Sequence, residues 1–440
     1  MTSKTALPST AQEAPEEAPE ETYVWFWTPD ATEPVVAGLI TREGPNYLFN
    51  YGRSYLERSN AIAIFDPELP LRRGVISPNR GLTLAGALRD GAPDAWGRRV
   101  IINRLLSVKD ESVDVDALDE LTYLLQSGSD RVGVLDFQRS GTTYAPRLGD
   151  AVPLAELQMI AERVEGGLPI APELERALFH GTSLGGARPK AAIEALDAKY
   201  IAKFSSTTDV TDVVKAEYVA MRLAARLGLN VATAKLERSA GKDVLLVERF
   251  DRVRTPAGWT RKSMVSALTL LGLDEMMGRY ASYQDLAEII RARFSQPKNN
   301  LHELFMRLVF NILCGNTDDH ARNHAAFWDG RTLTLTPAYD ICPQNRTGRA
   351  ASQAMAIIGE KRSSMLATCI EAAPQFLMTR KIATELIEAQ IHGIQKNFES
   401  VADEAQMPTI TRRQLWRRAF LNPYAFEEAP ASIVMLERDV

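Results

Sequence analysis

Gly315-Asn-Thr-Asp-Asp-His-Ala-Arg-Asn-His324 holds the sharpest constellation of reactive side chains in this chain of 440 residues. It directly follows an apolar run from Leu304 to Leu313, which is typical of a buried helix. Asp318 precedes Asn323 by five positions, which is the spacing of a kinase catalytic loop. In such a loop the aspartate orients or deprotonates the attacking hydroxyl, and the asparagine binds Mg²⁺. The spacing therefore predicts phosphoryl transfer at this loop.

A second aspartate, Asp340, lies seventeen residues beyond Asn323, after a short strand predicted over Leu333–Thr336. Mg²⁺ prefers oxygen ligands and usually takes one or two carboxylates beside the phosphates of a nucleotide. Asn323 and Asp340 fit that requirement.

Each part of this pattern also has a simpler interpretation. Taken alone, the pair Asp318 and Asp319 is typical of a loop cap or an Asx turn. His320 and His324 stand four positions apart, so they could be two zinc ligands with one of these aspartates as a third. The other interpretation makes His320 an orienting residue and His324 a structural histidine.

The order of elements upstream supports the kinase interpretation. A glycine-rich loop, Gly181–Ala187, precedes strands expected at Lys190–Leu196 and Tyr200–Phe204. A helix is expected at Val213–Leu227, followed by strands at Asn230–Leu236 and Asp243–Glu248. The loop matches neither G-x-G-x-x-G nor the Walker pattern, so it indicates no ordinary P-loop protein.

Three positions in this region match the polar groups of a kinase small lobe. Lys203, on the second strand, is placed to contact the phosphates, and Glu217 on the helix is placed to pair with it. Val247–Phe250 could be a hinge whose backbone reads adenine while Phe250 packs on the ring. An exposed strand lysine, a solvated glutamate and a core phenylalanine are the alternatives.

Composition restricts the class of protein. Hydrophobic residues make up 45% and charged residues 24%, as in ordinary globular proteins, and the net charge of −5 argues against a protein that coats nucleic acid. The three cysteines form no C-x-x-C pair, and no apolar run is long enough for a bilayer. With no secretion signal in view, we expect a soluble cytoplasmic protein.

The expected organisation has five parts. Residues 1–22 form an acidic, proline-rich disordered tail, and 23–140 form an N-terminal α+β domain with strands at Val35–Thr41, around Tyr47–Tyr51 and at Ala61–Phe65. Helical segments are expected near Thr83–Leu106 and Asp116–Gln126. Residues 141–180 are a linker and helical connection. A kinase domain then covers 181–425, with a small lobe at 181–255 and a helical lobe at 256–425, before a tail at 426–440.

Several motifs together resemble the HipA family, the Ser/Thr-kinase toxins of bacterial HipBA-type toxin–antitoxin pairs. The resemblance rests on Ser183-Leu-Gly-Gly-Ala-Arg-Pro-Lys190, Val247-Glu-Arg-Phe-Asp-Arg252, the Gly315–Asn323 segment, Leu335-Thr-Pro-Ala-Tyr-Asp-Ile341, Asp90-Gly-Ala-Pro-Asp-Ala-Trp-Gly-Arg98 and Asp130-Arg-Val-Gly-Val134. It covers about residues 35 to 400. It implies an α+β architecture in which an N-terminal α/β domain packs on a mainly α-helical kinase domain, similar to phosphoinositide kinases.

By matched position, the resemblance implies a role for each site residue. Asp318 would be the catalytic base, with Lys203 on the ATP phosphates and Asn323 and Asp340 on Mg²⁺. Ser183 matches a serine that the family autophosphorylates, which shuts ATP binding off because phosphate cannot share the nucleotide site. The remaining nucleotide contacts would come from Gly185, Gly186, Ala187, Arg188, Pro189, Lys190, Glu248, Arg249, Phe250, His320, Ala321, Arg322 and Tyr339.

The same resemblance implies the partners. They are a small helix-turn-helix antitoxin of the HipB type and a protein substrate such as an aminoacyl-tRNA synthetase, with DNA contacted only through the antitoxin and no membrane. Two departures concern substrate choice: the loop reads A-R-P-K rather than A-Q-E-K, and Asp319 replaces a glycine. A late basic cluster, made of Arg412, Arg413, Arg417 and Arg418, fits a solvated helix face better than a DNA contact.

Two other functions remain open from the sequence. A pseudokinase that acts as an antitoxin-bound co-repressor would keep the same residues without turnover. A metal-dependent phosphohydrolase would use Asp318, His320 and His324. The kinase toxin ranks first because separate features agree on one chemistry.

Overall fold

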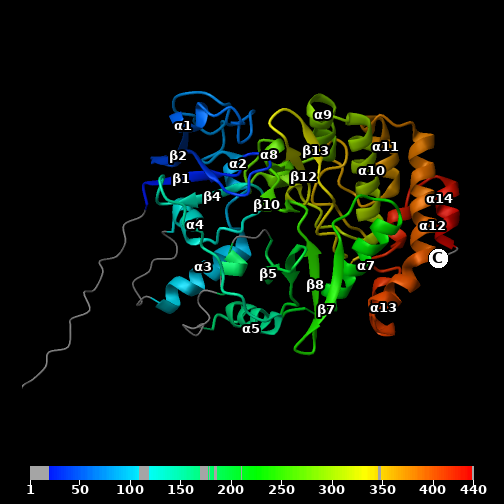
Figure 1. Ribbon diagram of the computed structural model, residues 1–440. Helices are drawn as coiled ribbons and strands as arrows, with labels where there is room; N and C mark the ends of the chain where they lie inside the picture. The colour runs from blue at the N-terminus through cyan, green and yellow to red at the C-terminus, as the bar shows by residue number, and fades with distance from the viewer. Residues whose placement is uncertain are drawn as a thin grey trace, which may run out of the picture.

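The computed structural model describes residues 19–108, 118–168, 177, 179–182, 186–209, 211–344 and 348–438. Ser183, Gly185 and nearly all of the tail expected at 1–22 lie outside these residues. An N-terminal α/β domain, blue to cyan in Figure 1, packs against a small sheet domain and a helical lobe, green to red. The predicted α+β architecture is confirmed.

The N-terminal domain is built on an antiparallel four-stranded sheet in the order β3-β2-β1-β4. Its strands are β1 (Glu21–Phe26), β2 (Val35–Glu43), β3 (Asn46–Tyr51) and β4 (Leu135–Gln138). Val24, Phe26 and Phe49 are buried in its core. Helices α1 (Arg53–Leu56), α2 (Gly86–Arg89), α3 (Ala95–Val108) and α4 (Glu120–Gln126) complete the domain.

One prediction for this domain was wrong. Ala61–Phe65 is no strand, because tyrosine hydroxyls satisfy its backbone: the Ile64 amide donates to Tyr51 Oη (2.9 Å) and Tyr55 Oη donates to the Ile62 carbonyl (2.8 Å). The helical part expected near 83–106 consists of two helices, α2 and α3. Pro93, in the segment between them, has no N–H with which to continue a helix.

The small lobe is a second antiparallel sheet, in the order β5-β6-β8-β7, with one helix against it. Its elements are β5 (Lys190–Glu194), β6 (Lys199–Lys203), α7 (Val213–Arg226), β7 (Ala234–Ser239) and β8 (Lys242–Glu248). Ala240 and Gly241 both have positive φ (48° and 81°), as a two-residue hairpin turn requires. The strand expected from Asn230 starts four residues later, because Asn230 and Ala232 exchange backbone hydrogen bonds with Ala338 instead.

The helical lobe surrounds helix α10, whose C-terminal half is buried from Arg307 to Cys314. Its helices are α8 (Ala267–Leu270), α9 (Tyr283–Arg293), α10 (Pro297–Cys314), α11 (Leu366–Ala372), α12 (Arg380–Glu404), α13 (Thr409–Leu415) and α14 (Ala431–Arg438). A hairpin, β9 (Arg252–Thr255) and β10 (Gly258–Arg261), and a small sheet, β11 (Met264–Ser266), β12 (Ala325–Trp328) and β13 (Leu333–Leu335), connect it to the rest. Helices α5 (Leu154–Glu165) and α6 (Phe179–Thr182) lie between the domains in sequence.

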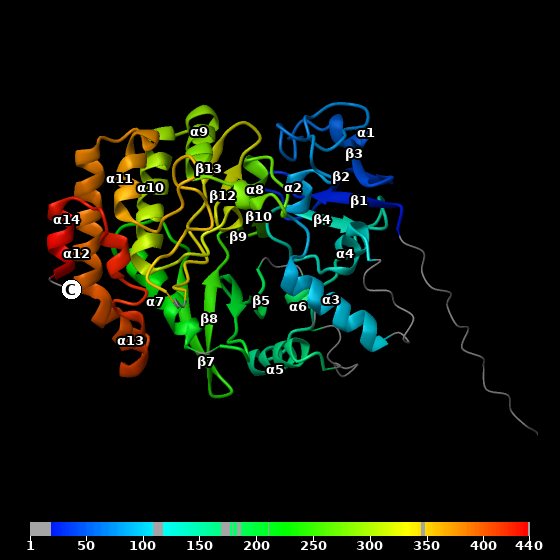
Figure 2. The same cartoon turned by 180° about the vertical axis from the view of Figure 1, so that it is seen from behind.

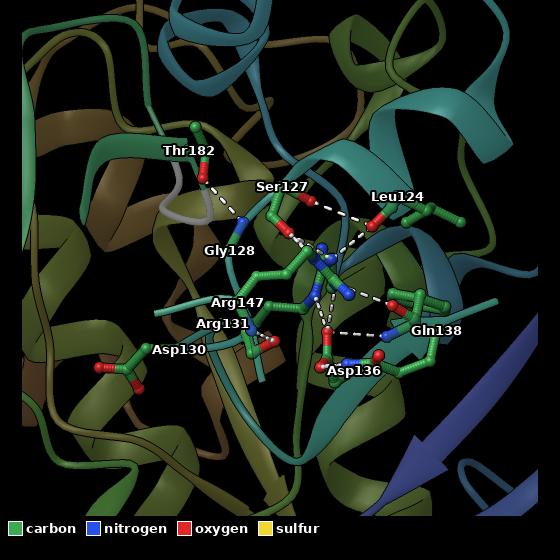
Figure 3. Close-up of polar contacts among 12 residues, drawn as sticks. Leu124, Ser127, Gly128, Asp130, Arg131, Asp136, Gln138, Arg147 and Thr182 are labelled. Carbon is green, nitrogen blue, oxygen red and sulfur yellow. Dashed lines mark hydrogen bonds and ion pairs between the residues drawn. The ribbon is translucent and has the colours of Figure 1, made fainter. Parts of the chain in front are cut away.

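Buried hydrogen bonds and ion pairs join the N-terminal domain to residues 249–252, which directly follow β8. Arg249 donates to the carbonyls of Asp130 (3.1 Å) and Arg131 (2.7 Å), and the Gly133 amide donates to Asp251 Oδ2 (2.8 Å). A second buried cluster lies inside the N-terminal domain, where Arg131 and Arg147 meet Asp136 at 2.9 and 3.0 Å (Figure 3). Seen from behind, α6 lies between β5 and α3 (Figure 2).

Among the described residues, no helix is long and apolar enough to cross a membrane. Cys314, Cys342 and Cys369 are buried free thiols.

Candidate active site

A cleft of about 360 Å³ lies where the N-terminal domain, the small lobe and the helical lobe meet. It gathers most of the predicted nucleotide residues from distant parts of the chain. Those that line it are Gly186, Ala187, Lys190, Lys203, Glu248, Arg249, Phe250, His320, Arg322, Asn323, Tyr339 and Asp340.

Lys203 is the centre of the charge arrangement in the cleft. Its ammonium forms ion pairs with Glu217 on α7 and with Asp340 beyond β13. Burial alone would lower the pKa of Lys203, but these two carboxylates outweigh burial and raise it. The lysine is therefore a permanent cation held between two lobes, as a phosphate contact requires.

Asp340 is presented to the cleft by an unusual backbone conformation. Its φ of 59° lies in the left-handed region, which aspartate tolerates better than most residues. Burial opposes its charge, but Lys203 and Lys190 keep the pKa of the Asp340 carboxyl well below its usual range. The carboxylate is therefore charged at neutral pH.

The loop that carries Asp318 starts where α10 ends. Gly315 has φ of 74°, and a Cβ there would lie 2.8 Å from the carbonyl oxygen of Ala419, so glycine is required for the chain to turn. Asp318 is exposed as a residue, but its carboxyl is partly desolvated by the surrounding protein. This desolvation and the nearby Asp340 raise its pKa, while His320 opposes the shift.

Asn323 closes the same loop. Its Nδ2 donates to the Asp318 carbonyl (3.2 Å), which leaves its side-chain carbonyl oxygen for a cation. That oxygen and the Asp340 carboxylate are the hard donors that suit Mg²⁺, and the cationic Lys203 and Lys190 suit phosphate. The residues present therefore fit magnesium and a nucleoside triphosphate.

His324 and His320 are not brought together. His324 is buried, with its Nε2 2.9 Å from Asp319 Oδ1, and Tyr283 Oη donates to the other oxygen of Asp319. Over the described ranges, no group of three His, Cys, Asp or Glu side chains could hold a metal ion. The zinc and phosphohydrolase interpretations therefore lose their ligand set, and His324 is the structural histidine.

The end of the cleft beside the predicted hinge is apolar. Ile201 and Val247 line it, and the half-buried Phe250 packs against Tyr339 with ring centroids 5.7 Å apart. The amides of Glu248 and Arg249 already donate to the carbonyls of Thr233 and Lys199 (both 2.8 Å). Arg249 itself is used in the buried ion pairs between the domains.

Three of the residues predicted to contact the nucleotide are buried or bonded to other groups. Arg188 forms an ion pair with Asp209, Pro189 is buried with its carbonyl bonded to the Phe204 amide (3.0 Å), and Ala321 is buried. The late basic cluster is partly neutralised, since Arg412 pairs with Glu399 and Asp403 and Arg417 pairs with Glu437.

Sequence reasoning missed one wall of the cleft. Asp90, Asp94 and residues 132–135 of the N-terminal domain line it. The motifs Asp90–Arg98 and Asp130–Val134, which contributed to the family resemblance, were the signal in the sequence that could have identified this wall. The sequence analysis assigned no residue of these motifs to the site.

Fold and site together define a protein of the kinase class. The family model for the HipA-like C-terminal domain matches residues 182–421, and the model for the HipA N-terminal domain matches residues 31–138. The chain belongs to the HipA family.

Curated relatives and a solved structure are similar to the chain. Y4mE of Sinorhizobium fredii, which is named as a kinase, is 26% identical over 317 residues, which are 67% of this chain and 71% of the relative. The serine/threonine-protein kinase toxin HipA of Shewanella oneidensis is 27% identical over 184 residues, but the match spans only 42% of that toxin. The structure of the Shewanella oneidensis HipA, HipB and operator DNA complex matches with a TM-score of 0.63 at 19% identity, over 95% of this chain and 99% of that one.

Proposed function

We propose that the chain is an ATP- and Mg²⁺-dependent protein serine/threonine kinase that acts as the toxin of a type II toxin–antitoxin pair. The observation that carries the proposal is the bridge from Lys203 to Glu217 and Asp340, inside a cleft that Asn323 also lines. These are the charged parts of a kinase site, contributed by elements of both lobes.

In the proposed mechanism the protein supplies positioning and charge. Lys203 and Lys190 hold the phosphates, while Asp340 and Asn323 would hold Mg²⁺, which neutralises charge on the phosphates when bound. Asp318 orients the hydroxyl of the substrate and accepts its proton, which its exposure in the loop after α10 permits. Tyr339 donates to the Arg322 carbonyl (2.7 Å), which ties the floor of the cleft to the Asp340 segment.

The finer parts of the proposal concern partners. The likeness to a HipA chain solved with HipB and operator DNA supports a helix-turn-helix antitoxin of the HipB type as partner, with DNA contacted through it. An aminoacyl-tRNA synthetase is the proposed substrate, and Ser183 the proposed site of autophosphorylation.

Growth of a bacterial host tests the toxin function. Induced wild-type protein is expected to arrest growth, and Asp318→Asn is expected to abolish the arrest at equal expression. Asp197→Asn, in the exposed turn between β5 and β6, is the matched control and should arrest growth like the wild type. Equal arrest by Asp318→Asn would contradict the proposal.

A further inference from the structure

Asp94 is a buried carboxylate in the cleft wall for which phosphoryl transfer has no use. It lies in the N-terminal domain, immediately before α3, and only 8% of the residue is exposed. Its Oδ1 atom has no hydrogen-bond partner. A buried carboxylate oxygen without a partner is costly, so the position calls for an explanation.

The charges around Asp94 belong to the nucleotide site. Burial raises the pKa of Asp94 to about 6, while Lys190, Arg322 and the Gly97 amide lower it and Glu275 raises it. Lys190 comes from the start of β5, and Arg322 and Glu275 come from the catalytic loop and the loop after α8. Glu275 is itself paired with Arg322 at 2.5 Å. Asp94 therefore faces cations that phosphates would also use.

The segment around Asp94 also contacts Gly186, near the end of the glycine-rich loop, and Lys190 after it. The Trp96 amide donates to the Gly186 carbonyl (3.2 Å), and Trp96 Nε1 donates to the Lys190 carbonyl (3.0 Å). A Cβ on Gly186 would lie 2.0 Å from Lys190 Nζ and 3.9 Å from Asp94 Oδ2, so the ammonium and the carboxylate lie against the same glycine. Gly91, three residues before Asp94, is fixed in turn because its carbonyl accepts from Arg131 (2.8 Å).

We propose that Asp94 is a gating carboxylate through which the N-terminal domain weakens nucleotide binding. The inference rests on the proposed function, because it concerns the same nucleotide site. In the free protein the Asp94 carboxylate lies beside the Lys190 ammonium at Gly186, and the charges of Lys190 and Arg322 both stabilise it. An incoming triphosphate would compete with Asp94 for these cations. A carboxylate at this depth repels a phosphate strongly, because the surroundings screen charge poorly. Asp94 acts through Lys190, so it is a positioning residue that sets affinity and takes no part in the transfer itself.

Calorimetric titration with Mg²⁺ and a non-hydrolysable ATP analogue tests the gate on the full chain at pH 7.5. Asp94→Asn is expected to bind the analogue roughly tenfold more tightly than the wild type, and in phosphoryl transfer its KM for ATP should fall while kcat stays within twofold. Asp94→Ser is the second variant. Asparagine and serine can both accept from the Gly97 amide at a helix start, so the test survives if one variant fails to fold.

Asp197→Asn is the matched control, because Asp197 is an exposed carboxylate in the turn between β5 and β6 and does not line the cleft. The affinity of this variant for the analogue should change less than threefold. Unchanged or weaker binding by the folded Asp94 variants would overturn the inference, and so would equal tightening by Asp197→Asn. If wild-type protein without phosphate on Ser183 bound no nucleotide, the proposed function itself would fall.

Discussion

Lys203 shows how single residues make this site. Its two carboxylate partners stand 14 and 137 residues away in the chain, on elements that only the fold brings together. The sequence was enough to select Lys203, Glu217, Asp318 and Asp340 as site residues, because their order and spacing match those of a kinase. A structural role for His324 was also the preferred interpretation of the sequence, but its partners Asp319 and Tyr283 could not be predicted from it.

Lys203→Met should lower phosphoryl transfer by about 10²–10³-fold, the usual cost of removing one group that stabilises charge at a reacting centre. Steady-state kinetics with ATP measures the effect. Lys235→Met is the control, because Lys235 lies on the surface and its nearest carboxylate, Glu237, is 3.9 Å away. Transfer by Lys203→Met within threefold of the wild type would exclude the proposed role.

The dependence of transfer on pH should report Asp318. Its pKa is raised above the ordinary value of 3.8, so the base is protonated, and kcat/KM is lost, as pH falls through that raised pKa. The neighbouring His320 opposes this rise in the pKa of Asp318. His320→Gln should therefore move the acidic limb of the profile to higher pH, and a limb that stays in place or moves down would argue against Asp318 as the base.

At the scale of elements, local patterns predicted the small lobe better than the N-terminal domain. The helix at Val213–Arg226 has an amphipathic pattern and Gly228 after it, and the hairpin of β7 and β8 has its turn residues in the sequence. The segment Ala61–Phe65 was wrongly predicted as a strand because its small and large apolar residues alternate. The hydroxyls of Tyr51 and Tyr55 complete its backbone hydrogen bonding instead. Hairpin β9–β10 was not predicted, although Pro256 and Gly258 at its turn were a signal in the sequence.

The glycine-rich loop gives a test at this scale. Gly186→Ala should weaken nucleotide binding at least tenfold, because φ at this position is 101° and a Cβ would collide with Lys190 Nζ. Gly44→Ala is the matched control, since Gly44 also has a positive φ (59°) but no atom within 4 Å of the added Cβ. Titration with nucleotide measures both variants, and equal affinities would show that the clash has no effect on the site.

Across the whole molecule, buried ion pairs fix the N-terminal domain beside the cleft. Asp251 accepts from Arg249, Arg252 and the Gly133 amide, so it joins the end of β8 to residues 132–135, which line the cleft. Arg131 holds the Asp90–Asp94 segment in a similar way, by donating to the Gly91 carbonyl. Neither cluster could be predicted from the sequence, because a buried arginine and a solvated one look the same in a single chain.

Asp251→Asn should reduce the free energy of unfolding by about 3–5 kcal/mol, because it leaves two buried guanidinium groups without a full counter-charge. Glu57→Gln, which breaks an exposed pair with Arg53, should cost less than about 1 kcal/mol. Urea unfolding measures both. Equal, small losses would show that the cluster does not hold the domains.

The same cluster should make the fold sensitive to acid. Burial opposes the charge of Asp251, but Arg249 and Arg252 lower its pKa to about 2 from 3.8. Its contribution is therefore complete above pH 3.8 and is lost as pH falls toward 2. The difference in stability between the wild type and Asp251→Asn should shrink over that range.

The most direct measurement is incubation of the purified protein with γ-³²P-ATP and Mg²⁺, wild type beside Asp318→Asn, with the label located by mass spectrometry. The account predicts Mg²⁺-dependent label on protein serine or threonine, Ser183 included, with the wild type only, while both proteins bind nucleotide equally. A wild type that arrives with phosphate already on Ser183 is first treated with a phosphatase. Label carried equally by Asp318→Asn, or none on a dephosphorylated wild type that binds ATP, would contradict the kinase assignment.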